Sequence, residues 1–165
     1  MKKLWAPWRI EYILSEKTDE CIFCKYPKLN DDKKYLILYR GEKAFIILNR
    51  YPYNNGHLMV VPYRHVSTPL NLDDSELLEM SKLINLSIQV LNEAMKPHGF
   101  NIGANIGKAA GAGIEYHYHI HVVPRWEGDT NYMPIIADTK VIVEALDKTY
   151  DKLLDALNKV VKKML

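Results

Sequence analysis

Apolar residues recur at helical spacing through the middle of the chain, between residues 73 and 96. Asp73 or Asp74 can cap the start of this segment, and a Pro-His-Gly sequence at 97–99 ends it. Steps of three or four residues put the apolar positions on one helix face. The pattern predicts a long amphipathic helix whose buried stripe is Leu77, Met80, Ile84, Ile88, Leu91 and Met95.

Shorter apolar runs have the composition of β-strands. The runs 33–40 and 43–50 are separated by a Gly-Glu dipeptide, which predicts a hairpin. Further strands are expected over 57–61, where a proline stops the run, and over 100–107. A strand is also expected over 115–126, where residue types alternate. The order of strands, helix, strands and helix favours an antiparallel α+β domain over a parallel βαβ array.

Helical periodicity returns after Pro134, with lysines opposite the apolar face. That face is formed by Ile142, Leu146, Leu153, Leu157, Val160 and Met164. The sequence does not decide whether this helix packs on its own sheet or on a partner subunit. The 165 residues are expected to form a single domain, 1–165, with a core at about 20–126 and a helical extension at about 137–165.

Composition narrows the class of protein only slightly. Hydrophobic residues make up 48% and charged residues 25%, as in ordinary globular domains. The net charge of +2 gives no reason to expect polymeric nucleic acid or a membrane as the main partner. No apolar run reaches bilayer-spanning length, and Pro7, Arg9 and Glu11 interrupt any signal-peptide core, so a cytoplasmic location is expected.

The clearest chemical signal is the segment EYHYHIHVVPRW, in which half of the six histidines stand at every second position. If this segment is a strand, His117, His119 and His121 point to one side, roughly 7 Å apart. Each buried ring would need its own hydrogen-bond partners, so a purely structural role is hard to reconcile with the row. The opposite side, which can reach a core, carries Tyr118, Ile120 and Val122.

Two kinds of chemistry fit this row. Histidines two apart on a strand can chelate a metal ion, although Glu115 and Glu127 are the only carboxylates close in sequence. Alternatively, the middle imidazole attacks phosphorus, because it is substantially deprotonated at neutral pH. The flanking rings would then bind the phosphoryl oxygens and protonate the leaving group. The GKAAGAG loop at 107–113 favours the second interpretation, since bare backbone N–H groups bind phosphate oxygens.

Several motifs together resemble a known family. HYHIHVV at 117–123 resembles the His-φ-His-φ-His-φ-φ motif of the histidine triad superfamily of nucleotide hydrolases and transferases. LNRYPYNNGHLMVVPYRH is similar to the second signature of that family, and NIGKAAG to its Asn-x-Gly-x-x-Ala-Gly loop. LWAPWR near the N-terminus and VVPRWEGDTNYMP after the triad resemble the branch that contains diadenosine tetraphosphate phosphorylases.

The resemblance implies a catalytic row of His117, His119 and His121. His119 would attack the α-phosphorus and become a covalent nucleotidyl-imidazole, while His121 would hydrogen-bond the phosphate. Asn49 would hold the ribose hydroxyls.

The same resemblance implies further nucleotide contacts. Asn105 would meet the phosphate chain or leaving group, and His57 would stand beside the phosphate site. Many members carry Gln or Ser four residues before the first triad histidine, where this chain has Gly113. Backbone N–H groups from Gly111 to Gly113 would therefore have to bind the phosphates, which favours the phosphorylase-like branch.

Cys21 and Cys24 are the only cysteines, and their CIFC spacing indicates metal ligation or redox chemistry. A redox couple usually needs a thioredoxin-like βαβ context, which this sequence does not have. CIFC is a frequent start in zinc-bearing members of the family, and there the resemblance implies His65 and His117 as the remaining ligands of a structural zinc. No organic cofactor is expected.

The resemblance implies an α+β histidine triad fold, with an antiparallel sheet of about five strands, the long helix across it and an added C-terminal helix. It also implies a homodimer. The expected activity is cleavage of a dinucleoside polyphosphate, with phosphate or water as acceptor. A nucleoside phosphoramidase or adenylyl hydrolase would use the same residues, and a zinc-stabilised nucleotide-binding module without turnover remains an alternative. A hexose-1-phosphate uridylyltransferase fits less well, because its usual triad ends in Gln where this chain has His121.

Overall fold

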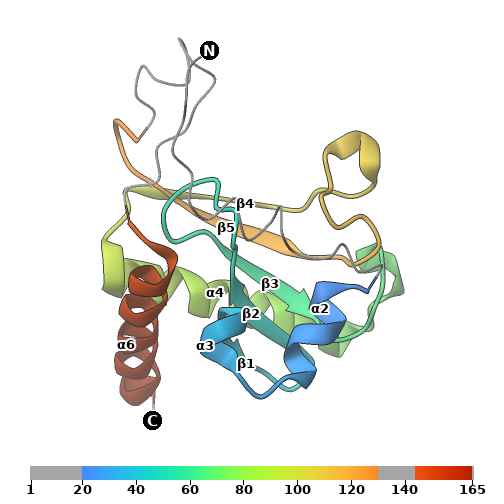
Figure 1. Ribbon diagram of the computed structural model, residues 1–165, viewed down its shortest axis with the longest axis horizontal. Coiled ribbons are helices and arrows are strands. Elements are labelled where there is room, and N and C mark those ends of the chain that lie inside the picture. The colour runs from blue at the N-terminus through green and yellow to red at the C-terminus, as the bar shows by residue number, and fades with distance from the viewer. Residues whose placement is uncertain (1–19, 130–143, 165) are drawn as a thin grey trace.

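The computed structural model describes residues 20–129 and 144–164 of the chain. The five strands form one antiparallel sheet in the order β1-β2-β3-β5-β4 (Figure 1). The predicted α+β class, with a sheet of about five strands, is therefore confirmed. The strands are β1 (Ile37–Arg40), β2 (Ala44–Leu48), β3 (Leu58–Pro62), β4 (Gly99–Gly103) and β5 (Ile120–Arg125).

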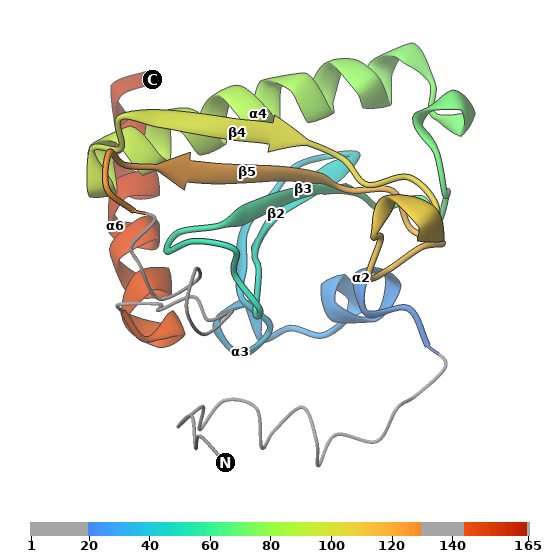
Figure 2. The same ribbon diagram turned by 90° about the horizontal axis from the view of Figure 1, so that it is seen from above.

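Helices lie on both sides of this sheet (Figure 2). The long helix α4 (Asp74–Met95) packs against β2, β3 and β5. The short helices α2 (Ile22–Lys25) and α3 (Asp32–Tyr35) lie on the opposite side. Every residue of β2 and β3 is buried, because these central strands are covered from both sides. Single turns of 3₁₀-helix complete the described chain: η1 (Tyr26–Lys28), η2 (Pro69–Asn71) and η3 (Lys108–Ala110).

The long helix starts where the sequence predicts, and its cap is Asp73. The Asp73 carboxylate accepts a hydrogen bond from the backbone N–H of Glu76 at 2.9 Å, and the Glu76 carboxylate accepts one from the backbone N–H of Asp73 at 2.8 Å. At the other end, Lys96 takes a left-handed conformation with φ of 49°. The expected helix over 73–96 is thus confirmed to within one residue at each end.

The predicted buried stripe of this helix is wrong in part, because Leu77 is 38% exposed and only Met80 and Leu91 of that stripe are fully buried. The face turned to the sheet also includes Leu83, Leu86 and Val90.

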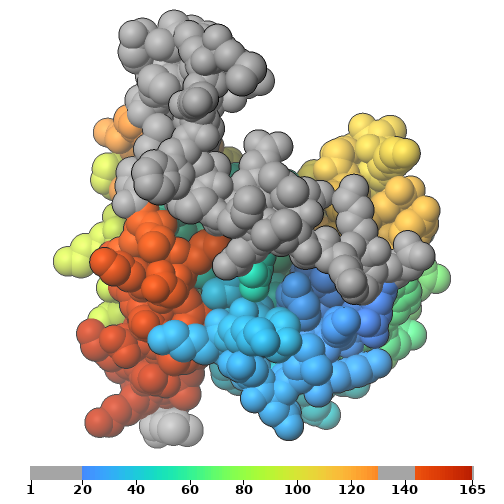
Figure 3. Space-filling view, viewed as in Figure 1, coloured from blue at the N-terminus to red at the C-terminus, as the bar shows by residue number. Residues whose placement is uncertain are grey.

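The C-terminal helix α6 (Leu146–Met164) packs on its own chain. The sequence had left open whether it packs there or on a partner subunit. The helix contacts α4 and β1, and the Tyr150 hydroxyl donates a hydrogen bond to the backbone oxygen of Ile37 at 2.8 Å. An ion pair of 2.7 Å joins Lys33 to Asp151, and Figure 3 shows α6 directly beside α3. Among the residues that the structure describes, no helix is both long and apolar enough to cross a membrane.

Parts of the predicted organisation lie outside the described residues. These are the LWAPWR stretch, residues 130–134 of the segment that follows the triad, and the beginning of the helical extension expected from residue 137. In the described part of the extension, helix α6 begins at Leu146.

Strands β1 and β4 are shorter than the sequence predicts. Residues 33–35 belong to α3 instead of β1, because the Asp31 side chain accepts a hydrogen bond from the backbone N–H of Lys34 and starts a helical turn. Leu36, with φ of 63°, then redirects the chain into β1. The strand expected over 100–107 ends at Gly103, where its pairing with β5 ends at His121.

Candidate active site and metal centre

The histidine row lies in an extended segment that becomes regular strand only at Ile120. His121 is therefore in β5, whereas His117 and His119 precede it, so the strand predicted over 115–126 begins later than expected. The cause is Pro62 on the neighbouring strand, which has no N–H to continue the β3–β5 ladder. The backbone N–H of Tyr118 instead bonds the backbone oxygen of Val66 at 2.6 Å.

Alternation nevertheless holds along the segment. The side chains of His117, His119 and His121 are 0%, 5% and 8% exposed. Phe23 of α2 covers this side, with ring centroids 5.4 Å from His117 and 5.0 Å from His119. The residues that follow each histidine pack with the hydrophobic core, as the sequence predicts: Tyr118, Ile120 and Val122.

The position of the proton on His119 follows from its hydrogen-bond partner. Nδ1 of His119 lies 2.8 Å from the backbone oxygen of His117, an acceptor, so Nδ1 must donate and Nε2 keeps its lone pair. Burial lowers the pKa of His119, and the bond to His117 opposes this only in part. At neutral pH the ring is therefore uncharged and has a free nitrogen, which is the state that a nucleophile needs.

His57 and His121 form a second buried unit, with Nε2 of His57 2.9 Å from Nδ1 of His121. The backbone N–H of Tyr53 donates to Nδ1 of His57 at 3.0 Å, so the proton of His57 is on Nε2 and is donated to His121. His121 then carries its own proton on Nε2, where it is available as a donor. Burial, assisted by neighbouring histidines, lowers the pKa of His57 to about 3 and that of His121 to about 4.

Asn49, the predicted ribose ligand, stands beside this pair. Its Nδ2 lies 3.3 Å from Nδ1 of His57, and its Oδ1 accepts a hydrogen bond from the backbone N–H of Tyr51 at 2.9 Å. A carboxamide has two N–H groups and two oxygen lone pairs, so each atom keeps capacity for one more partner.

The predicted phosphate-binding loop leaves β4 beside the histidine row, because Gly103 pairs with His121. Asn105 is half-buried in the segment that follows. Gly111 ends η3 with φ of 82°. A Cβ atom at Gly111 or Gly113 would have no neighbouring atom within 4 Å, so both backbones border open space, as a ligand-binding loop requires.

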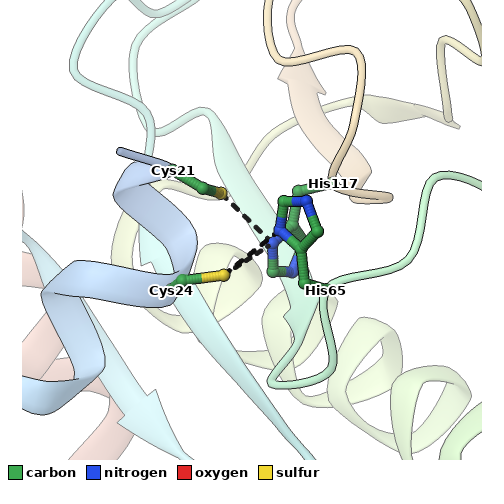
Figure 4. A group of neighbouring side chains, drawn as sticks. All are labelled: Cys21, Cys24, His65 and His117. Carbon is green, nitrogen blue, oxygen red and sulfur yellow. Dashed lines mark hydrogen bonds between the residues drawn. The ribbon is translucent and has the colours of Figure 1, made fainter. Parts of the chain in front are cut away.

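The structure brings together the four residues predicted to hold zinc (Figure 4). The ligand atoms of Cys21, Cys24, His65 and His117 lie within 4.8 Å of one another. Sγ of Cys24 is 3.2 Å from Nδ1 of His65, and Sγ of Cys21 is 3.3 Å from Nδ1 of His117. Tetrahedral zinc, with bonds of about 2.3 Å to sulfur and about 2.0 Å to nitrogen, places such atoms roughly 3.6 Å apart. The donor set therefore fits zinc.

The fold prepares these donors for a cation. Nε2 of His117 donates to the backbone oxygen of Pro62 at 2.8 Å, which leaves Nδ1 as a lone-pair donor toward the cysteines. Burial lowers the pKa of His117 to about 4, so the ring is neutral. Burial and the neighbouring Cys21 raise the pKa of the Cys24 thiol, and a bound cation would offset both effects.

Sequence reasoning missed residues that hold the histidines in place. The ring of Tyr53 lies against His57 and His121, with centroid distances of 4.5 Å and 5.3 Å. Asn54 and Asp129, far apart in sequence, are hydrogen-bonded at 2.8 Å. The sequence signal for Asn54 was its place in an Asn-Asn-Gly turn, and turn asparagines usually serve the turn itself.

Comparisons with known proteins agree with this geometry. Residues 30–128 match the family model for the HIT domain. The chain is 40% identical over 158 residues to a Mycobacterium tuberculosis protein named AP-4-A phosphorylase. The aligned region covers 90% of this chain and 80% of that protein. A crystal structure of a zinc-bound histidine triad family protein from Mycobacterium smegmatis has a TM-score of 0.71 at 23% identity, covering 87% of this chain and 97% of the other. A hypothetical histidine triad nucleotide-binding protein from Sulfolobus tokodaii has a TM-score of 0.66 at 29% identity, covering 87% and 93%.

The segment that matches the family model contains α4 and all the strands of the described sheet. It also contains His117, His119 and His121. By its sequence and by its fold, this chain belongs to the HIT domain family.

Proposed function

We propose that this chain is a histidine triad enzyme that cleaves dinucleoside polyphosphates through a covalent nucleotide on His119. The observation that carries the proposal is the 2.8 Å bond from Nδ1 of His119 to the backbone oxygen of His117, which leaves Nε2 unprotonated. The name of the 40% identical relative from Mycobacterium tuberculosis, AP-4-A phosphorylase, supports diadenosine tetraphosphate as the substrate to test first.

The proposed reaction has two displacements at one phosphorus. In the first, Nε2 of His119 bonds to the α-phosphorus while the bridging P–O bond breaks and the nucleoside polyphosphate leaves. Nδ1–H stays bonded to the oxygen of His117, which stabilises the positive charge that the substituted ring acquires. In the second, phosphate or water attacks the phosphorus and the N–P bond breaks. The Nε2–H group of His121 donates to a non-bridging oxygen in both steps.

The remaining contacts are assigned to the parts of one nucleotide. Asn105 and the backbone N–H groups of Gly111 and Gly113 would bind the phosphate chain, since their loop leaves the sheet beside His121. Asn49 would hold the ribose with the hydrogen-bonding capacity that its bonds to His57 and Tyr51 leave unused.

We propose that Cys21, Cys24, His65 and His117 hold a structural zinc. All four ligand positions would be filled by protein, so the metal would supply a cross-link rather than a catalytic step. His117 belongs to the set, and its backbone oxygen receives the Nδ1–H bond of His119. The cross-link would therefore fix the acceptor that orients the nucleophile.

The test incubates the zinc-loaded protein with diadenosine tetraphosphate, with and without phosphate. Phosphorolysis gives ADP and ATP, and hydrolysis gives AMP and ATP. A wild-type protein that forms neither pair refutes turnover of this substrate and favours a nucleotide-binding module. Faster turnover of adenosine phosphoramidate in parallel reactions would overturn the proposed substrate class.

A pair of histidine variants tests the nucleophile. His119→Ala should lower the rate by roughly 10³-fold or more, because the covalent step is lost. His98→Ala is the matched control, since His98 is exposed and its Nδ1 accepts a hydrogen bond from the backbone N–H of Glu127, away from the histidine row. Its activity should stay close to that of the wild type. Activity that survives in His119→Ala would show that another group attacks phosphorus.

Three wider predictions are tested separately. The homodimer implied by the family should give twice the chain mass in light scattering. The single domain over 1–165 should resist limited proteolysis as one unit. Fractionation of cells should find the protein in the cytoplasm.

A further inference from the structure

The turn that precedes His57 is held by the buried side chain of Asn54, which is 7% exposed. One N–H of its carboxamide donates to the backbone oxygen of Pro124 at 3.0 Å. The other donates to Oδ2 of Asp129 at 2.8 Å. Both donors of a buried carboxamide are thus satisfied by groups at the far end of β5, which fixes the turn against that strand.

The reason for this arrangement lies in the register of the sheet. Leu58 pairs with Val122, so continuing the antiparallel ladder would place Gly56 opposite Pro124. Gly56 instead takes φ of 78° and turns the chain away. The Asn54 carboxamide then supplies the hydrogen bond that the oxygen of Pro124 would have received from a continuing strand.

Asp129 is a strong anchor for this contact. Its side chain is 8% exposed and forms an ion pair of 2.7 Å with Arg125. Oδ2 also accepts a hydrogen bond from the backbone N–H of Trp126 at 3.1 Å. A buried carboxylate with several donors has one favourable position, so the atom that receives Asn54 is itself fixed.

The turn fixed by Asn54 carries the groups that surround His57. The backbone oxygen of Asn54 accepts from the backbone N–H of His57 at 3.2 Å. The adjacent peptide, through the N–H of Tyr53, donates to Nδ1 of His57 at 3.0 Å. With that N–H in place, a proton on Nδ1 would put two donors face to face, so only the Nε2–H form of His57 fits.

We propose that Asn54 is a positioning residue that selects the Nε2–H form of His57 and, through it, the protonation pattern of His121. The path runs from Asn54 to the N–H of Tyr53, then through His57 to Nδ1 of His121 at 2.9 Å. Its consequence for catalysis rests on the proposed function, in which Nε2–H of His121 binds phosphoryl oxygen. The expected protonation of the His57 and His121 rings does not depend on the proposed function.

Asn55, the next residue, provides a matched control. Its Nδ2 donates to Glu144 at 3.2 Å, and its Oδ1 accepts from the hydroxyl of Thr149 at 3.1 Å, so it ties the same turn to α6. Truncating Asn55 removes a carboxamide of equal size from the same turn but leaves the contacts to Pro124 and Asp129 in place.

The first measurement uses the zinc-loaded wild-type protein alone, with ¹⁵N-labelled histidines and no substrate. Long-range ¹H–¹⁵N correlation spectra distinguish a protonated ring nitrogen from an unprotonated one, and His57→Gln assigns the signals. His57 and His121 should each be protonated on Nε2. Protonation on Nδ1 of either ring would overturn the proposal, whether or not the protein turns over any nucleotide.

The second measurement compares Asn54→Ala with Asn55→Ala. Asn54→Ala should introduce the Nδ1–H form of His57 and lower kcat by about tenfold or more with a smaller change in KM. Asn55→Ala should keep the wild-type ring signals and a kcat within about twofold of wild type. Unchanged ring signals in a folded Asn54→Ala protein, or the same change in both variants, would overturn the selective role of Asn54. If Asn54→Ala does not fold, the protonation of His57 and His121 in the wild-type spectrum decides whether the proposal stands.

Discussion

Replacing Gly56 with alanine should destabilise the protein, because two independent features of this position require glycine. Its φ of 78° lies in the left-handed region. A Cβ atom at Gly56 would also lie 2.7 Å from Sδ of Met95 and 3.1 Å from Cδ2 of Leu91, two side chains of α4. Both features lie next to His57, so the position joins the packing of the long helix to the geometry of the site.

The expected loss can be worked out from these features. A left-handed conformation costs alanine roughly 1 kcal/mol relative to glycine. Pressing a methyl group into packed side chains costs typically about 1–3 kcal/mol, and the flexible Met95 keeps this toward the lower part of that range. The reduced entropy of the unfolded chain returns about 0.4–1 kcal/mol. The net loss should be about 2 kcal/mol, which lowers Tm by roughly 4–8 °C in a domain of this size.

Two other glycines allow the cost of the backbone strain to be measured separately from the cost of the contact with α4. Gly107 has φ of 81°, and a Cβ there would meet nothing within 4 Å. Gly107→Ala should therefore show the strain alone, a change of about 0.5 kcal/mol or less after the entropy gain. Gly103 has neither a positive φ nor a close neighbour, so Gly103→Ala should be neutral or slightly stabilising.

Urea unfolding of all variants with saturating zinc, followed by circular dichroism, measures these differences from midpoints at a common m value. Equal losses for Gly56→Ala and Gly107→Ala would show that contact with α4 contributes nothing. A Gly56→Ala protein as stable as the wild type would refute both parts of the reasoning.

Three further predictions concern other buried groups. Because folding lowers the pKa of His57 to about 3, the unfolded chain takes up a proton on this ring at a higher pH than the folded chain does. The free energy of unfolding should therefore fall as the pH drops from about 6.5 toward 3. His57→Gln should reduce that slope by up to about 1.4 kcal/mol per pH unit in urea unfolding, and an unchanged slope would contradict the buried neutral state. Cys24→Ser should lose the zinc that elemental analysis finds in the wild type, and retained metal would refute the ligand set. Tyr150→Phe removes the bond to the Ile37 oxygen and should cost about 1–2 kcal/mol; no change in Tm would mean that water replaces the hydroxyl.

The parts of the fold that could be predicted from sequence are those with a periodic burial pattern. The span of α4 and the buried runs of β2 and β3 follow the spacing of their elements. The face of α4 that is buried could not be predicted in the same way, because apolar residues stand on more than one face and the sheet covers Leu83 and Val90 rather than Leu77. The start of β1 could not be predicted, because Tyr35 reads as a strand residue while the side chain of Asp31 starts a helical turn instead. The start of β5 depends on Pro62 in another strand, which no local pattern contains.

The four candidate metal ligands could be predicted because each stands in a motif: Cys21 and Cys24 in CIFC, His65 at the end of LNRYPYNNGHLMVVPYRH, and His117 in the triad. The structure places their donor atoms close together, although Cys21 and Cys24 come from the start of α2 and the histidines from segments far along the chain. The support around the site could not be predicted in the same way. Asn54 and Asp129 meet only because the register of β3 and β5 brings the turn to the end of β5.

The different states of the histidines have one physical origin. The backbone oxygens of Pro62 and His117 can only accept, so His117 and His119 donate to them and keep the other nitrogen free. The backbone N–H of Tyr53 can only donate, so His57 must carry its proton on the opposite nitrogen. Alternating spacing puts similar rings in a row, but the polarity of the backbone group that each ring meets decides which nitrogen is protonated, and hence whether the ring suits the proposed role of ligand, nucleophile or donor. The fold determines which backbone group each ring meets. For this reason, identical side chains in one site can differ in the nitrogen that carries the proton and can therefore take different chemical roles.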